Sequence, residues 1–317
     1  MKLENQIKEK ARQIGFDLVG ITKAEPLKAD EVQFFKQWLD KGLYAQMEFL
    51  HLNPEKRFNP SSLLEGAKSV IVAALNYKPP VIEQGILPQN PVGRIASYAQ
   101  YEDYHTFIKN SLQKLVDFLK ITAGENHKFK ICVDSAPLAE KALAVRAGIG
   151  FIGKNHLLIN PHFGPQLLLG EIITTIALEG DKPIEPDCKD CDKCIRSCPT
   201  GALNPDGFLD ANKCISYLTI EHKSEIPAGL AAKIGDRLFG CDDCILACPY
   251  QKIAPACANK NFRFFSDRAK LDLCEILKLD EKGFDGKFVA SPIKRISLER
   301  LKRNAKICLD NINNKRL

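Results

Sequence analysis

The chain has 317 residues, 45% hydrophobic and 26% charged, with a net charge of +6 and a pI near 8.6. This composition is typical of a globular protein with room for about two domains, and no apolar run approaches the roughly 18 residues of a membrane helix. Twelve cysteines without an N-terminal export signal indicate metal ligation in a reducing compartment, so we expect a cytoplasmic protein without membrane contact.

The N-terminal segment predicts a helix, a strand and a second helix. Apolar residues recur at helical spacing over residues 3–14, and Gly15 follows, so the helix should end at that glycine. Residues 16–21 then predict a strand. Asp30 is expected to cap the second helix. The inward side chains of that helix are expected to be Val32, Phe35, Trp38 and Leu39.

Two apolar segments on either side of a proline-rich loop predict strands. They cover residues 69–75 and 93–98, and the loop covers residues 79–91. Asp103 is expected to cap a long helix. Its inward side chains are expected to be Phe107, Leu112, Leu115 and Leu119.

Asp134 follows a buried strand predicted at residues 129–133 and precedes Ser135 and a helix through Ala147. In open α/β sheets, the end of such a strand is where ligands bind. Asp134 or Ser135 could equally cap the following helix. The residues alone leave both interpretations open.

Gly148, Gly150 and Gly153 superficially match a dinucleotide-binding fingerprint. That fingerprint follows a strand and opens a helix, whereas these glycines follow a helix and precede the apolar run 157–159. The context therefore excludes nicotinamide binding. The glycines instead allow the backbone to approach a bulky flat ligand or a neighbouring strand. A last strand at 167–177 and a linker at 183–186 follow.

Two cysteine runs dominate the second half of the chain. The first is Cys188-x2-Cys191-x2-Cys194-x3-Cys198-Pro199, the second is Cys241-x2-Cys244-x3-Cys248-Pro249, and Cys214 lies between them. In two-cluster ferredoxins, three cysteines of a run bind one [4Fe–4S] cluster and the cysteine before proline binds the other. The predicted sets are Cys188, Cys191, Cys194 and Cys248, and Cys198, Cys214, Cys241 and Cys244.

Structural zinc is the alternative for these cysteines, because short C-x2-C pairs also form zinc sites. Zinc sites use two pairs of thiols, whereas here three evenly spaced cysteines precede a Cys-Pro and the Cys-Pro occurs twice. The spacing therefore favours iron–sulfur clusters. Such clusters relay single electrons, so a second redox centre or an external partner is expected.

The C-terminal segment predicts helices at 267–277 and 298–312, the second capped by Ser297. Basic residues gather around the start of the second helix, where their side chains could contact phosphates. A solvated helix face is the other explanation for such a group. The basic residues are Lys294, Arg295, Arg300, Lys302 and Arg303.

Several segments together resemble the epoxyqueuosine reductase family, whose members complete queuosine in the tRNA anticodon. The resemblance covers nearly the whole chain. The segments that carry it are GRIASYAQYEDYH (93–105), VDSAPLAEKALAVRAGIGFIGKN (133–155), LGEIITT (169–175), CKDCDKCIRSCPTGAL (188–203), LDANKCISYLTIEHK (209–223), IGDRLFGCDDCILACPYQK (234–252) and SPIKRISLERLKRNAKICL (291–309).

The resemblance implies a fold of three parts. These are an α/β (α+β) cobalamin-binding catalytic domain at 1–180, a ferredoxin-like domain with two [4Fe–4S] clusters at 181–258, and a short C-terminal helical module that contacts tRNA at 259–317. The implied reaction reduces the epoxide of epoxyqueuosine in tRNA, with cobalamin reduced through the clusters by an external low-potential electron donor. The alternatives are a reductive dehalogenase-like corrinoid enzyme and a two-cluster electron-transfer protein without a corrin.

The resemblance also implies roles for particular residues. Asp134 matches the family's proton donor, and burial beside a macrocycle should raise its pKa so that it can hold a proton at neutral pH. The residues expected around cobalamin are Arg57, Ser97, Asp134, Asn155, Leu158, Leu169 and Ser216. Those expected to bind tRNA are Lys223, Lys294, Arg295 and Arg303.

Overall fold

The computed structural model describes residues 1–81, 90–185 and 188–314. The strands are β1 (Leu18–Lys23), β2 (Ser69–Asn76), β3 (Val92–Ile95), β4 (Phe129–Cys132), β5 (Phe151–Ile152), β6 (Leu158–Ile159), β7 (Leu167–Thr174), β8 (Arg237–Phe239) and β9 (Lys270–Asp272). The helices are α1 (Leu3–Ile14), α2 (Ala29–Asp40), α3 (Pro54–Phe58), α4 (Tyr104–Ala123), α5 (Glu140–Arg146), α6 (Lys193–Arg196), α7 (Ile215–Ile220), α8 (Ala228–Ile234), α9 (Asp243–Leu246), α10 (Pro249–Ile253), α11 (Leu273–Lys278), α12 (Glu281–Lys287) and α13 (Leu298–Asn314).

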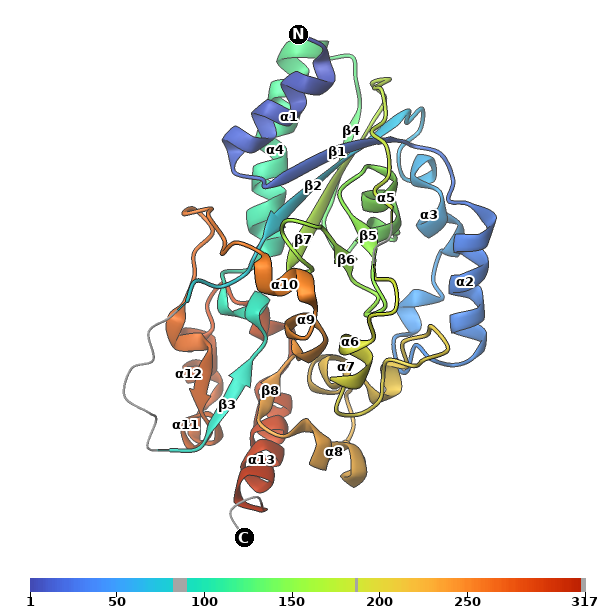
Figure 1. Ribbon diagram of the computed structural model, residues 1–317. Helices are drawn as coiled ribbons and strands as arrows, with labels where there is room; N and C mark the ends of the chain where they lie inside the picture. The colour runs from blue at the N-terminus through green and yellow to red at the C-terminus, as the bar shows by residue number, and fades with distance from the viewer. Residues whose placement is uncertain (82–89, 186–187, 315–317) are drawn as a thin grey trace.

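The larger sheet has the strand order β1-β2-β7-β4, and every neighbouring pair is antiparallel. Every residue of β2 is buried, because both faces of the sheet are covered. Ile71 and Leu75 belong to the apolar cluster shared with α1 and α4, whereas Val70 and Val72 belong to the cluster shared with α5. Figure 1 shows α1 and α4 side by side on one face of this sheet and α5 on the other. Side chains alternate along a strand, so this apolar run fills two layers.

A smaller sheet has the order β8-β3-β9, in which β3 is parallel to β8 and antiparallel to β9. Each strand comes from a different one of the three predicted domains. A large apolar cluster beside the sheet includes Ile95, Phe239, Leu271 and Leu301. The cysteine segment and the C-terminal helices therefore share a core. The domain boundaries at 180 and 258 stay a prediction.

Most of the N-terminal predictions are confirmed. The first helix ends at Gly15, whose φ of 113° is left-handed. The carboxylate of Asp103 accepts the N–H of His105 at 2.9 Å and so caps α4. The cap of α2 is Lys28, and Asp30 lies within the first turn, so that prediction is wrong. No residue of α2 is fully buried, although the predicted inward side chains are its less exposed ones.

Two predictions about helix starts are also wrong. α5 begins at Glu140, so neither Asp134 nor Ser135 caps it, and residues 133–139 form a loop. The sheet beside Asp134 is antiparallel, so the rule for parallel strand ends does not apply there. The helix predicted at 267–277 instead contains β9 and α11, because pairing with β3 overrides helical spacing at its start.

The glycine segment lies against a neighbouring strand. A Cβ added to Gly150 would come within 2.3 Å of the carbonyl oxygen of Ile159, because β5 and β6 form a tight hairpin. Of the two expected reasons for these glycines, the close approach of a neighbouring strand therefore accounts for Gly150. Of the predicted loop 79–91, residues 82–89 lie outside the described residues, as does residue 186 of the predicted linker. Within the described ranges, no helix is long and apolar enough to cross a membrane.

Candidate active site and cofactor cavities

The two predicted cysteine sets line two separate cavities. A cavity of about 160 Å³ is bordered by Cys188, Cys191, Cys194 and Cys248. A second cavity, of about 290 Å³, is bordered by Cys198, Cys214, Cys241 and Cys244. The cysteine before each proline thus lies with three cysteines from outside its own run, which is the exchange typical of paired [4Fe–4S] clusters.

The size of the cavities bears on the choice of metal. Within the described part of the chain, no group of three or more His, Cys, Asp or Glu side chains is arranged to bind a single metal ion. The smaller cavity, at about 160 Å³, is much larger than one zinc ion with Zn–S bonds of about 2.3 Å. Four thiols around a space of this size fit a cubane cluster.

The two cavities differ in their surroundings. Exposed residues, including Lys154 and Pro249, border the first cavity. Buried residues, including Ala96, Leu203 and Ile215, border the second. Burial raises the pKa of the Cys241 thiol to about 12, so binding of a thiolate there requires a metal to compensate. Buried residues thus border both cavities, and among the described lining residues exposed ones occur only at the first.

Three residues predicted to contact cobalamin lie at the second cavity. Asn155 and Ser216 line it. The backbone N–H and the hydroxyl of Ser97 both donate to the carboxylate of Asp242 at 2.7 Å, and Asp242 lines the same cavity. The thiols of the second set and these three polar residues thus share one region of the structure.

The other predicted cobalamin residues lie in different surroundings. Leu158 and Leu169 belong to the apolar cluster between the larger sheet and α5. Arg57, on α3, accepts the N–H of Ala139 through its backbone carbonyl at 3.1 Å. Its side-chain Nε is buried without a hydrogen-bond partner among the described residues. An unpaired buried donor is costly, so a polar group of a bound ligand fits beside Arg57.

Asp134 lies two residues after the end of β4, in a network of ionisable side chains. Its carboxylate Oδ2 is 3.0 Å from Nε2 of His105 and 3.2 Å from a terminal nitrogen of Arg295. The other ring nitrogen of His105 is 2.7 Å from the carboxylate of Asp103. Nε of Arg295 also donates to Glu221 at 2.9 Å. His105 and Arg295 therefore hold Asp134 from two sides.

This network reverses the expected pKa of Asp134. The hydrogen bond from His105 and the charge of Arg295 lower that pKa despite burial, so the predicted rise is wrong. The carboxylates of Asp103 and Asp134 together raise the pKa of His105 to about 9. At neutral pH the proton therefore lies on the imidazole, 3.0 Å from Oδ2 of Asp134. Sequence reasoning missed both partners of Asp134, although all three stand within the segments that carry the resemblance.

The raised pKa of His105 predicts a pH-dependent contribution to stability. The folded-state pKa of about 9 lies above the ordinary value of 6.5, so the contribution is complete below about pH 6.5 and is lost as pH rises through about 9. The loss of melting temperature in His105→Gln should thus be larger at about pH 6 than at about pH 10. Thermal unfolding at both pH values measures it. An equal loss at both would show that the imidazolium pairs add no stability.

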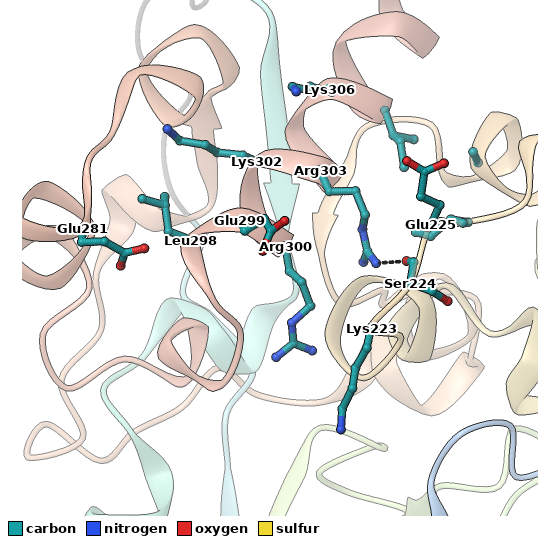
Figure 2. Close-up of a pocket in the computed structure, with 13 residues that line it drawn as sticks. Lys223, Ser224, Glu225, Glu281, Leu298, Glu299, Arg300, Lys302, Arg303 and Lys306 are labelled. Atoms are coloured by element: carbon teal, nitrogen blue, oxygen red, sulfur yellow. Dashed lines mark hydrogen bonds between the residues drawn. The ribbon is translucent and has the colours of Figure 1, made fainter.

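A basic pocket of about 780 Å³ lies between α13 and the segment after α7. Figure 2 shows Arg300 and Arg303 extending from α13 and Lys223 from the facing segment. Arg303 donates to the carbonyls of Leu218, His222 and Ser224, which join α13 to the end of α7. The cations of the pocket are Lys223, Arg300, Lys302, Arg303 and Lys306.

The structure separates the predicted tRNA-binding residues. Lys223 and Arg303 line the basic pocket, whereas Lys294 forms an ion pair with Asp285 at 2.6 Å and Arg295 contacts Asp134. Lys306 of the pocket was missed. Its signal was the spacing of four residues from Lys302, which places both on one face of a helix.

Paired thiol-lined cavities, an ionisable network beside the larger sheet and a basic pocket on a helical module together define an iron–sulfur oxidoreductase. Two family models match the chain: epoxyqueuosine reductase QueG, DUF1730, over residues 57–135, and a 4Fe-4S double cluster binding domain over residues 187–251. An epoxyqueuosine reductase from Francisella cf. novicida is 37% identical over 98% of this chain and 89% of its own length. The chain belongs to the epoxyqueuosine reductase family.

Solved structures of this family have the same fold. An epoxyqueuosine reductase bound to an epoxyqueuosine-modified tRNA-Tyr stem loop matches with a TM-score of 0.91 and 33% identity, over 98% of this chain and 81% of that one. The Bacillus subtilis enzyme, in a structure with that protein's Asp134 catalytic loop swung out of the active site, matches with a TM-score of 0.91 and 32% identity, over 99% of this chain and 82% of that one.

Proposed function

We propose that this protein reduces the epoxide of epoxyqueuosine at the tRNA wobble position and so forms queuosine. The observation that carries the proposal is the second cavity, where four cluster-type thiols lie beside polar residues suited to a corrin. The relative bound to an epoxyqueuosine-modified stem loop supports the substrate. Since the substrate is a tRNA, we expect the protein to work in the cytoplasm.

The residues present fit both kinds of cofactor. Four thiols around each cavity would hold a [4Fe–4S] cluster. Asn155, Ser216 and Ser97 would contact a corrin near the second cavity, and the unpaired Nε of Arg57 would meet a polar group of it. When bound, cobalamin supplies the strongly reducing metal centre that the reaction requires.

The positions of the cavities imply an order of electron transfer. Two exposed residues, Lys154 and Pro249, form part of the wall of the first cavity, and an external low-potential donor would approach it there. Asn155 and Ser216, two of the candidate corrin contacts, line the second cavity. Electrons would therefore enter at the set containing Cys188 and leave at the set containing Cys244.

The side chains around Asp134 would transfer a proton in the reaction. Removing the epoxide oxygen as water breaks two C–O bonds and consumes two electrons and two protons. Electrons would arrive through the clusters, and the proton on Nε2 of His105 lies 3.0 Å from Oδ2 of Asp134. That proton would pass through the Asp134 carboxylate to the departing oxygen, and Arg295 would stabilise the negative charge left behind. The second proton of the product water would come from solvent.

Binding of tRNA should depend on the basic pocket. Replacing Lys223 with alanine should lower the slope of log affinity against log salt by about 0.9 for duplex contacts or about 0.7 for single strands, because one phosphate contact is lost. Lys223 gives a cleaner test than Arg303, whose replacement also removes bonds to three carbonyls. Lys114→Ala, on the exposed side of α4, is the control. Unchanged slopes for Lys223, Lys294, Arg295 and Arg303 variants would show that these residues make no phosphate contacts.

The function is tested with anaerobically purified protein, cobalamin, a low-potential reductant and tRNA carrying epoxyqueuosine. Mass spectrometry of the digested tRNA should show loss of one oxygen from the modified nucleoside. Turnover should require cobalamin. Cluster reduction without cobalamin uptake would favour the electron-transfer alternative, and turnover of a halogenated substrate but not of tRNA would favour the dehalogenase alternative.

A further inference from the structure

A buried glutamate lies behind the Asp134 loop. Glu171, on β7, is fully buried and stands opposite Val72 of β2 and Cys132 of β4. Neither of its carboxylate oxygens has a hydrogen-bond partner among the described residues. An ionised carboxylate in such a position costs several kcal/mol of free energy, and the group takes up a proton instead. Burial and nearby carboxyls accordingly raise the pKa of Glu171 well above its ordinary value.

A second glutamate, Glu140, lies in the first turn of α5, which packs on β7, and its carboxyl group is close enough to that of Glu171 for the two to interact. Two ionised carboxylates are both acceptors and cannot bond to each other, but a protonated Glu171 can donate to Glu140. Burial raises the pKa of Glu140 to about 7 and raises that of Glu171 well above its ordinary value. Glu140 accepts a backbone N–H, which favours its carboxylate, whereas Glu171 has no such donor, so of the two Glu171 is the group that keeps the proton.

Glu140 in turn contacts the backbone of the Asp134 loop. Its Oε1 accepts the N–H of Asp134 at 2.7 Å. Asp134 has a φ of 55°, in the left-handed region that side chains rarely adopt. This conformation directs the Asp134 carboxylate toward His105 and Arg295. A charge-assisted bond to the N–H helps to keep the loop in that conformation.

Four charged groups act on the pair electrostatically. Positive charge comes from Arg57 on α3, from Lys141 on α5 and from the imidazolium of His105 on α4, and negative charge comes from Asp134. The Cys132 thiol on β4 stays neutral because burial raises its pKa to about 12. Val72 on β2, which stands opposite Glu171, does not titrate.

We propose that Glu140 is a positioning residue that holds the Asp134 loop for catalysis, and that Glu171 acts as the proton-bearing partner that keeps Glu140 in place. The inference rests on the proposed function, since it concerns the role of Asp134 in that reaction. In one structure of the Bacillus subtilis relative, the Asp134 catalytic loop of that protein is swung out of the active site. A loop that can leave the active site needs a residue that holds it in place.

The protonation of Glu140 and of His105 sets the direction in which kcat changes with pH. The Glu140 carboxylate forms as pH rises through about 7, so kcat should rise there, and it should fall as His105 loses its proton near pH 9. Glu140→Gln keeps an acceptor but cannot ionise, so the acid limb of the profile should disappear. Glu171→Gln keeps a neutral donor and should behave like the wild type. Glu171→Leu removes the donor and should move the acid limb to higher pH.

The decisive variant is Glu140→Ala, compared with Glu65→Ala on the surface. Loss of loop position should lower kcat by roughly 10²-fold without changing the Kd for tRNA. Hydrogen exchange of the segment 129–139, measured on the protein without substrate, should become faster. Glu140→Gln provides the same exchange measurement if the alanine variant does not fold.

Wild-type kcat in Glu140→Ala, or unchanged exchange together with an unchanged acid limb in Glu140→Gln, would overturn the inference. A wild-type protein that does not reduce epoxyqueuosine would instead refute the proposed function. The wild-type assay therefore separates the two failures.

Discussion

Asp134→Asn is expected to lower the rate of epoxyqueuosine reduction by roughly 10²–10⁴-fold, the usual contribution of a positioned acid or base. The variant should fold and should bind both cofactors and tRNA, because asparagine has nearly the same size. It cannot receive the proton from Nε2 of His105 and pass it on. It also loses the charge that pairs with Arg295. Single-turnover kinetics with preformed tRNA complex measures the chemical step.

The matched control is Asp117→Asn, the same exchange on an exposed position of α4. Its turnover should equal that of the wild type. If Asp134→Asn reduced epoxyqueuosine at the wild-type rate, the proton would come from water or another side chain, and the carboxylate would serve only to hold His105 and Arg295.

Cys244→Ser is expected to abolish turnover and to lower the iron content from about eight to about four atoms per chain, because one of two [4Fe–4S] clusters loses a thiolate. Cys244 borders the second cavity, which Asn155 and Ser216 of the candidate corrin contacts also line. Electrons could then reach the first cluster but go no further. Iron analysis and electron paramagnetic resonance after anaerobic reduction measure the loss.

Cys274→Ala is the control for this experiment, since Cys274 lies on α11 outside both sets. Its iron content should stay at about eight atoms per chain, and the same holds for alanine at Cys132, Cys257 and Cys308. Zinc in place of iron after anaerobic purification would contradict the cluster assignment altogether.

The order of the elements followed largely from local signals. The α1 and α4 helices have helical spacing together with a glycine end or an aspartate cap, and β2 is a continuous apolar run. Predictions failed where pairing decided the outcome. β9 forms because β3 lies beside it, although 267–277 has helical spacing by itself. The start of α5 is set by the loop 133–139, whose conformation depends on distant contacts.

The candidate site divides in the same way. Repeated spacing and the two Cys-Pro steps suffice to sort eight cysteines into two sets, because each run of ligands is local in the chain. The electrostatics of Asp134 depend on His105, 29 residues away, and on Arg295, 161 residues away. Burial alone would raise the pKa of Asp134, and only the folded chain supplies the cationic partners that lower it.

The sequence by itself therefore determined the family, the grouping of eight cysteines into the two sets that line the two cavities, and the position of Asp134, since all three are read from motifs and spacings along the chain. Only the tertiary structure decided which group holds the proton, which cations share the basic pocket and how Glu140 meets Glu171. A pKa or an ion pair depends on the distance between groups, and sequence separation does not set that distance.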